Sequence, residues 1–505
     1  MKELVILQEG LESTYELENL YEIFVVKSRI HFAENEADFN QKLNVGDYGL
    51  LIRYKEQEIN IILMENLRIP GPQILSQTSC DFNTDKVLDS RTLFVRDANQ
   101  KKIKNKLKKA VYEILQPYFT PMSKWGILVG IRPVKIVHEL LDEGETIENI
   151  ETILKEMYLI KPDKVKLMIE IALRERPHLV PNNPDAISLY LCIPFCPTRC
   201  VYCSFPSNDL KQKGKLLPEY MDKLEQEVVY AIEHIHSVGK YVDCIYIGGG
   251  TPTSIDEVQL NSLLETISNH LDLNIVKEYT IEAGRPDTIS KEKLEIMKKH
   301  GVNRVCINPQ TLNEETLITI GRAHTSDEII TTMALAKSVG FETINMDLIM
   351  GLPGETAEDA LRTVKKVLEL DPENITIHTL SVKRASRLHE DPEHFELAHD
   401  QEVAKMLDVS DQVIRDGNLS PYYMYRQKKM IGHLENVGYA KIGHESLYNM
   451  RIMEEKHTIV ACGAGAVSKI CTPEENRFER VANIKGLEAY LDRFDEILLK
   501  KTLLK

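Results

Sequence analysis

Three cysteines stand close together near the middle of this 505-residue chain. Cys196, Cys200 and Cys203 have the spacing CxxxCxxC. Thiolates this close together indicate an iron–sulfur cluster, and a 4Fe-4S cluster normally takes four protein thiolates. Three cysteines therefore leave one iron without a protein ligand, and an open metal position can bind a substrate or a cofactor, as it does at a catalytic zinc.

A structural zinc site is the main competing interpretation of these cysteines. Structural zinc takes four ligands, usually as two separated pairs. The sequence has no second pair after Cys203. We therefore favour an iron–sulfur cluster, and three buried cysteines that only pack against their neighbours are the remaining alternative.

The elements that must position such a cluster alternate between strand-like and helix-like patterns. Repeated βα units predict a parallel sheet with helices outside it. Six strands are fewer than the eight of a complete barrel. The predicted strands lie near residues 187–193, 242–247, 278–282, 304–307, 343–348 and 374–380.

Polar or small residues follow several of these predicted strands. Gly248–Pro252, the segment GGGTP, follows the second strand, and glycines let the backbone approach a ligand closely. The third, fourth and fifth strands lead to Glu282, Gln310 and Asp347. Ligands of parallel α/β proteins bind beyond the carboxyl ends of the strands, so we expect these residues at one site. A tight turn explains the glycines equally well when they are taken alone.

The cysteine spacing, with Tyr202 just before the last cysteine, resembles that of the radical S-adenosylmethionine (radical SAM) enzymes. The wider segment IPFCPTRCVYCSF is most similar to the branch of oxygen-independent coproporphyrinogen III oxidases, and within it to HemZ-type members. The resemblance implies that the open iron of a 4Fe-4S cluster chelates SAM. An electron from the cluster then cleaves SAM to a 5′-deoxyadenosyl radical.

The resemblance also implies a fold and a set of SAM-binding residues. The fold is a partial, laterally open (β/α)6 barrel over about residues 185–385. The implied SAM site holds one or two SAM molecules, and Tyr190 is expected beside the reacting groups as well. The implied SAM-binding residues are Tyr190, Tyr202, Gly249, Gly250, Thr251, Glu282, Gln310, Arg322 and Asp347.

We expect two further domains around this core. Residues 1–180 form an α+β domain that is β-rich to about residue 70, with a hairpin between Tyr48–Tyr54 and Ile59–Met64, and helical from about residue 97. Residues 177–184 contain three prolines, which should end the preceding helix and mark a boundary. Residues 386–505 form a mixed α/β extension that covers the substrate, with a helix near 400–416 and another near 485–499.

Composition limits the possible partners and the compartment. A net charge of −15 argues against nucleic-acid binding, which needs a basic surface. The chain has nine cysteines and neither a signal-peptide pattern nor an apolar run of about 18 residues. These features predict a cytoplasmic protein with reduced cysteines and no transmembrane segment.

Two basic clusters stand out from this acidic background. One contains Arg384 and Arg387 after the last predicted strand, and the other contains Arg426 beside an aromatic segment. Arginine forks and aromatic faces suit a flat macrocycle with several carboxylates. Solvated surface charge explains each cluster equally well when it is taken alone. Their other members are Lys383, Lys428, Lys429, Tyr422, Tyr423 and Tyr425.

The family resemblance implies oxidative decarboxylation of two propionates of coproporphyrinogen III, a tetrapyrrole, to vinyl groups. The product is protoporphyrinogen IX, and reduced flavodoxin or ferredoxin is the expected electron donor. A haem-trafficking chaperone and a radical methyltransferase of haem breakdown are the alternatives. The chain departs from the best-known oxidases at Phe205, where they have a further cysteine, and at Cys192, where they commonly have histidine.

Overall fold

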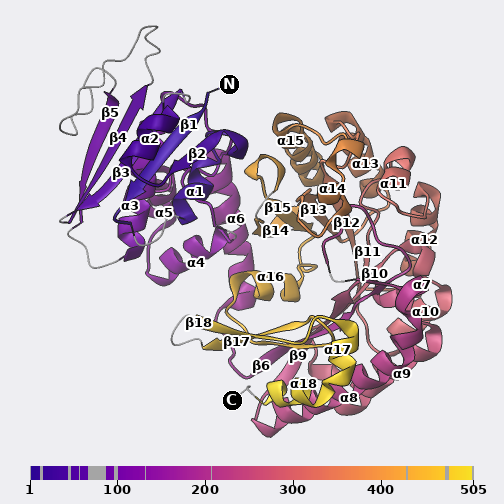
Figure 1. The fold of residues 1–505 in the computed structure, drawn as a ribbon. Coiled ribbons are helices and arrows are strands. Elements are labelled where there is room, and N and C mark those ends of the chain that lie inside the picture. The colour runs from indigo at the N-terminus through magenta and orange to yellow at the C-terminus, as the bar shows by residue number, and fades with distance from the viewer. Residues whose placement is uncertain are drawn as a thin grey trace. The chain divides into compact units, whose positions relative to one another are not determined.

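The computed structural model describes residues 2–11, 15–43, 47–55, 57–65, 87–95, 100–130, 132–205, 207–427, 430–472 and 477–502. The chain forms two compact units (Figure 1). Unit 1 contains residues 1–131 and 139–169, and unit 2 contains residues 132–138 and 170–505. Helices α4 (Val134–Asp142) and α6 (Pro162–Leu179) are divided between the two units.

Unit 1 is built on a five-stranded sheet with the order β2-β1-β3-β4-β5. Strand β1 pairs in parallel with β2 and β3, whereas β3, β4 and β5 are antiparallel. The hairpin predicted from the sequence is confirmed as β3 and β4. The strands are β1 (Leu4–Glu9), β2 (Ile30–Ala33), β3 (Tyr48–Lys55), β4 (Glu58–Glu65) and β5 (Val87–Phe94).

Helix α3 (Gln100–Leu115) covers this sheet with an apolar stripe. Leu107, Val111 and Leu115 recur one turn apart, are buried, and pack in one cluster with Leu50 of the sheet. This periodicity predicts the helix correctly from the sequence. The other helices of unit 1 are α1 (Tyr15–Tyr21), α2 (Glu36–Leu43) and α5 (Ile147–Glu156).

Unit 2 is built on an eleven-stranded sheet with the order β14-β15-β13-β12-β11-β10-β9-β6-β16-β17-β18. All six predicted strands are present and pair in parallel in chain order. They form the expected partial (β/α)6 barrel. The six strands are β6 (Ala186–Ile193), β9 (Tyr241–Gly249), β10 (Glu278–Gly284), β11 (Arg304–Ile307), β12 (Thr343–Met350) and β13 (Asn374–Thr379).

Helices lie on the outside of these strands (Figure 1). Three of them begin with a capping box, in which Asp256, Thr325 or Thr356 binds the backbone of the first turn. These caps fix where each helix starts and therefore how long each loop at the strand ends is. The helices are α7 (Leu210–Lys213), α8 (Leu217–Ser237), α9 (Glu257–His270), α10 (Lys291–Lys299), α11 (Glu314–Thr319), α12 (Ser326–Val339), α13 (Ala357–Glu369) and α14 (Arg387–Glu390).

The C-terminal extension adds strands to both sides of the barrel sheet. Strand β16 (Ile459–Cys462) pairs in parallel with β6, so it is a seventh parallel strand that the sequence analysis missed. Residues near 421–450, which have no clear periodicity, contain β14 (Ser420–Tyr425) and β15 (Asn436–Ala440). The short pair β7 (Phe195–Cys196) and β8 (Asn208–Asp209) lies beyond β6 in the chain, and β17 (Val467–Thr472) and β18 (Arg477–Ala482) form a hairpin.

The helices of the extension agree with the sequence analysis in one case and differ in another. Helix α15 (Asp400–Asp416) has the predicted bounds. The single helix expected near 485–499 is two helices, α17 (Leu487–Asp492) and α18 (Phe494–Lys501). Between α15 and these two helices lies α16 (Leu447–Glu454), which the sequence analysis did not predict.

The proline-rich segment differs in detail from its prediction. Helix α6 continues through Pro177 and ends at Leu179. Pro177 lies in the last turn, where the ring removes only one hydrogen bond near the end of the helix. Among the described residues, no helix has the length and apolar character needed to cross a membrane.

Candidate functional site

The three cysteines lie in the loop that follows β6, which we call the cluster loop (residues 194–205). Cys200 is buried, and Cys196 and Cys203 are partly buried. Burial, together with the neighbouring Cys203 and Cys200 thiols, raises the pKa of Cys196 to about 11. The three thiols therefore lie close enough to interact. A bound metal would deprotonate them, because its positive charge outweighs these effects.

The glycine triplet at the end of β9 lies directly against the cluster loop. A Cβ on Gly250 would meet Phe195 O at 2.5 Å and Cys196 Sγ at 3.0 Å, and a Cβ on Gly249 would meet Cys192 Sγ at 2.8 Å. Gly249 also has a φ of +114°, which other residues rarely adopt. Only glycine fits at these two positions, so the triplet packs directly against the cluster loop and lies beside the thiols.

Backbone hydrogen bonds hold the triplet and the loop together. Gly250 N donates to Ile193 O at 2.9 Å, and Thr251 N donates to Phe195 O at 2.7 Å. The Thr251 hydroxyl lies 3.4 Å from Cys196 Sγ. These contacts fix the register between the first cysteine and the triplet.

Arg322 connects the ends of β10 and β11 to the cluster loop. Its Nη1 donates to Asn308 O at 2.8 Å and to Gly284 O, and its Nη2 donates to Tyr202 OH at 3.2 Å. The buried Nε finds no hydrogen-bond acceptor among the described residues. A buried donor without a partner costs free energy, so this N–H suits an anionic group of a bound ligand.

Two carboxylates face the same end of the barrel. Tyr246 OH donates to Glu282 Oε1 at 2.6 Å, and burial raises the pKa of Glu282 to about 7. Asp347 Oδ2 lies 3.6 Å from His378 Nε2, and Asn345 donates to Asp347 Oδ1 at 2.7 Å. Burial alone would raise the pKa of Asp347, but these partners hold it below its ordinary value. One carboxyl group can thus carry a proton while the other is ionised.

Gln310 has a backbone conformation that glutamine rarely adopts. Its φ is +68°, and its backbone N donates to Asp347 O at 3.0 Å. Such a conformation persists only where surrounding contacts impose it, which is common at ligand sites. This strained conformation supports the prediction that Gln310 is a site residue beside Asp347.

Tyr190 belongs to a stack of three tyrosines. The ring centroid of Tyr246 lies 4.3 Å from that of Tyr448, and that of Tyr190 lies 6.2 and 6.0 Å from those of Tyr246 and Tyr448. Tyr448 comes from α16 and was not predicted, because no local pattern connects it with β6. The stack forms an aromatic wall next to Glu282.

The segment after β13 packs against the cluster loop. Leu388 N donates to Val201 O at 3.1 Å, and the Arg199 guanidinium donates to Ala385 O. Arg384 and Arg387 are exposed on this segment. Two of the predicted arginines therefore lie on a segment attached to the cysteine motif.

The third predicted arginine has a different environment. Arg426 is only 6% exposed, and its guanidinium donates to the carbonyls of His433 and Leu434. Burial lowers its pKa to about 10. Lys428 and Lys429 lie outside the described residues. The geometry therefore gives Arg426 a role in holding the backbone at His433 and Leu434.

Arg285 also contacts the cluster loop, although the sequence analysis did not single it out. It is 3% exposed, donates to Thr198 Oγ1 at 2.8 Å and pairs with Asp287 at 2.7 Å. Its place three residues after Glu282, at the end of a predicted strand, could have identified it. It fixes the loop between the first two cysteines.

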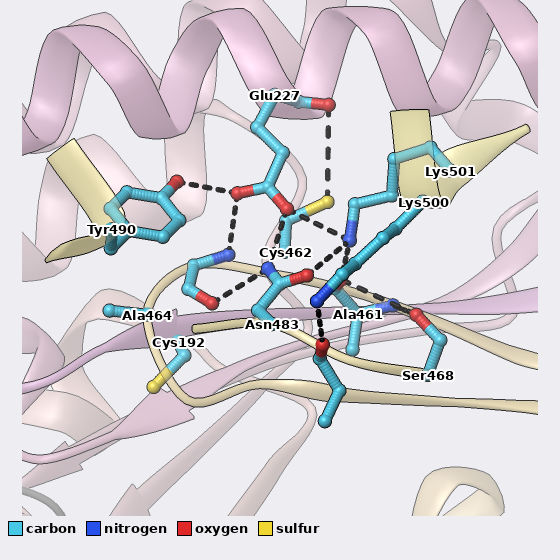
Figure 2. Close-up of polar contacts among 12 residues, drawn as sticks. Cys192, Glu227, Ala461, Cys462, Ala464, Ser468, Asn483, Tyr490, Lys500 and Lys501 are labelled. Carbon is cyan, nitrogen blue, oxygen red and sulfur yellow. Dashed lines mark hydrogen bonds and ion pairs between the residues drawn. The ribbon is translucent and has the colours of Figure 1, made fainter. Parts of the chain in front are cut away.

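A buried polar network joins α8 to C-terminal elements beside β6. Figure 2 shows Glu227 of α8 between Tyr490 and Lys501, with Asn483 beside them. Gly463 N, just after β16, donates to Glu227 Oε2 at 2.8 Å. This network attaches the C-terminal elements to the barrel next to the strand that leads into the cluster loop.

Known proteins resemble this chain in sequence. The family model of the radical SAM superfamily matches residues 190–367. The oxygen-independent coproporphyrinogen-III oxidase-like protein HemZ of Bacillus subtilis is 39% identical over 399 residues, which are 78% of this chain and 79% of HemZ. The heme chaperone HemW of Bacillus subtilis is 31% identical over 61% of this chain and 76% of HemW.

A solved structure shows the same fold. The coproporphyrinogen III oxidase HemN of Escherichia coli superposes with a TM-score of 0.51 over 64% of this chain and 72% of HemN. The superposed sequences are 22% identical. At this identity the likeness concerns the fold alone.

Proposed function

Because the chain belongs to the radical SAM superfamily, in the family of HemZ-type oxygen-independent coproporphyrinogen-III oxidase-like proteins, we propose that it converts coproporphyrinogen III to protoporphyrinogen IX. The reaction oxidatively decarboxylates two propionates to vinyl groups without oxygen. For each vinyl group one SAM would be consumed by hydrogen-atom removal, and one carbon dioxide and one electron would leave the substrate, the electron passing to an external acceptor. The superfamily implies a 4Fe-4S cluster and SAM as cofactors. One observation supports this choice of substrate: the segment with Arg384 and Arg387 is attached to the cluster loop.

The cofactors fit the residues of the site. We propose that Cys196, Cys200 and Cys203 hold the cluster, which together with SAM supplies the radical that begins the reaction. Gly249 and Gly250 let the backbone after β9 pack directly against the segment that carries Cys196, which brings this backbone beside the thiols. In this proposal SAM, in one or two molecules, is surrounded by Thr251, Tyr202, Arg322, Glu282, Gln310, Asp347 and Tyr190.

The remaining groups bind and orient the tetrapyrrole. Arg384 and Arg387 attract propionates, because charge-assisted contacts between guanidinium and carboxylate groups are strong and directional. In this proposal Tyr190, which stacks with Tyr246, contacts the macrocycle with its aromatic ring. Reduced flavodoxin or ferredoxin serves as the electron donor in this proposal.

The test supplies coproporphyrinogen III, SAM and a reductant to the reconstituted protein under nitrogen. Mass spectrometry of the products should show the loss of two carboxyl groups. The amount of 5′-deoxyadenosine should increase together with the decarboxylated product. SAM cleavage without any change of the tetrapyrrole would reject the oxidase proposal. A methylated or opened ring would indicate haem breakdown instead.

A haem chaperone is the second candidate, and the similarity to HemW of Bacillus subtilis favours it. Phe205, where the best-known oxidases have a cysteine, is 66% exposed just beyond the cysteine motif. An exposed aromatic side chain suits contact with haem or with a partner protein. Tight haem binding without turnover in the same experiment would support the chaperone.

A further inference from the structure

Three side chains of unit 2 bring metal-binding groups together outside the cluster loop. His138 comes from α4, Glu175 from α6 and Glu454 from the end of α16. Each side chain is at most 1% exposed. One ligand atom from each residue lies within 4.8 Å of the other two. The cluster thus combines one imidazole with two carboxylates in a fully buried place.

The distances suit a small cation. His138 Nε2 lies 2.9 Å from Glu175 Oε2 and 4.0 Å from Glu454 Oε2. Ligands at the zinc distances of roughly 2.0–2.2 Å in a tetrahedral site are separated by roughly 3.4 Å. The observed separations lie on both sides of this value, so small side-chain shifts would complete the geometry.

A second observation concerns Glu175 alone. Its Oε1 is buried and has no hydrogen-bond partner among the described residues. A buried carboxylate oxygen without a donor is costly. Such an atom next to an imidazole and a second carboxylate is satisfied by a metal ion.

The charges of the cluster also call for a cation. Glu175 and Glu454 are both buried, and their ligand oxygens lie within 4.8 Å of each other. Arg132 interacts electrostatically with Glu454, but its Nη1 pairs with Glu455 and donates to Met453 O. Two buried carboxylates at close range are stable when a divalent cation lies between them.

We propose that His138, Glu175 and Glu454 bind one first-row divalent transition-metal ion. One imidazole and two carboxylates suit Zn²⁺, Mn²⁺, Fe²⁺ or Co²⁺, whereas Mg²⁺ and Ca²⁺ prefer oxygen ligands alone. The ion ties the end of α16 to α4 and α6, and α16 carries Tyr448 of the tyrosine stack. This site does not depend on the proposed function.

The experiment separates this ion from the cluster iron. The full chain with Cys196→Ser, Cys200→Ser and Cys203→Ser is titrated with Zn²⁺ and, in parallel, with Co²⁺, whose absorption reports its ligands. Gel filtration followed by elemental analysis should show one retained zinc equivalent. Loss of one ligand in Glu175→Gln or His138→Asn should weaken binding by roughly a hundredfold, because even second-shell losses cost up to that factor.

Glu455→Gln in the same background is the matched control, because Glu455 is buried next to Glu454 but pairs with Arg132 and Lys469. It should keep the zinc equivalent. Zinc should also raise the melting temperature of the parent chain and of this control, but not that of Glu175→Gln. A folded parent chain that retains no zinc equivalent overturns the proposal, as does unchanged zinc binding in the folded Glu175→Gln variant. If Glu175→Gln does not fold, the zinc titration and the Co²⁺ spectrum of the parent chain still test the proposed metal site.

Discussion

Single residues of the cluster loop give the most direct prediction. Cys196→Ala should lower the sulfide content of anaerobically reconstituted protein to near background and remove the cluster iron, because only two thiolates of the motif would remain. Cys471→Ala is the control, since this half-buried cysteine lies outside the loop and contacts the carbonyls of Glu455 and His457. Elemental analysis measures both variants. Full iron content in Cys196→Ala would show that the cluster is held elsewhere.

Gly250 allows a second prediction at the scale of one methyl group. A Cβ there would lie 2.5 Å from Phe195 O, so Gly250→Ala must move the cluster loop. A misplacement of about 1 Å can cost roughly a hundredfold in rate, and we expect such a loss in 5′-deoxyadenosine formation. Gly214→Ala is the matched control, because its Cβ would meet only Leu210 at 3.9 Å. Equal rates in the two variants would contradict the close approach.

The raised pKa of Glu282 predicts that the stability of the protein depends on pH. This pKa rises from 4.5 to about 7 on folding, mainly through burial. The folded chain therefore binds this proton more tightly than the unfolded chain, and stability falls as the pH rises from about 4.5 to 7. The shift corresponds to at most roughly 3 kcal/mol.

Glu282→Gln should remove this part of the pH dependence and stabilise the protein above pH 7. Thermal unfolding without SAM at several pH values measures the difference between the variant and the parent chain. Parallel stability curves for the two proteins from pH 5 to pH 8 would rule out the raised pKa.

At the scale of elements, the network around Glu227 joins α8 to the C-terminal extension. Glu227→Gln would leave the buried Lys501 ammonium without its counter-charge, which typically costs about 3–5 kcal/mol. Denaturant unfolding should show this loss, and adding Lys501→Met should recover part of it. Glu233→Gln on the exposed side of the same helix should change stability by less than about 0.5 kcal/mol. Equal stability of both glutamine variants would show that the network contributes little.

At the scale of the whole molecule, the segment after β13 meets the cluster loop almost 190 residues away in the chain, as the bond between Arg199 and Ala385 shows. If Arg384 and Arg387 bind propionates there, each change to glutamine should cost about 1.5–3 kcal/mol. This equals roughly a tenfold to hundredfold loss of substrate affinity. SAM cleavage without substrate should stay near the parent level.

Arg426→Gln is the contrasting variant, because the Arg426 guanidinium is buried and donates to a backbone carbonyl. It should lower thermal stability more than the other two substitutions do. Substrate binding measured beside 5′-deoxyadenosine formation separates the two effects. Parent-level affinity in Arg384→Gln and Arg387→Gln would remove this segment from the substrate site.

The sequence by itself determined the features that depend on local periodicity and spacing. The six barrel strands and the α3 stripe follow from apolar patterns within short segments, because burial on one face repeats with the geometry of each element. The CxxxCxxC motif follows from the spacing of three cysteines within one short segment. The predicted strand ends were also sufficient to single out Glu282, Gln310 and Asp347 as candidate site residues, since parallel strands present their carboxyl ends at one edge of the sheet.

Only the tertiary structure decided which distant segments complete the site. Strand β16 pairs with β6 across about 270 residues, and Tyr448 reaches the stack with Tyr190 from α16. Arg426 turns inward although its sequence context resembles that of a surface cluster. Long-range pairing depends on which exposed edges and apolar faces meet after the barrel has formed, and the periodicity of one segment carries no information about its distant partner.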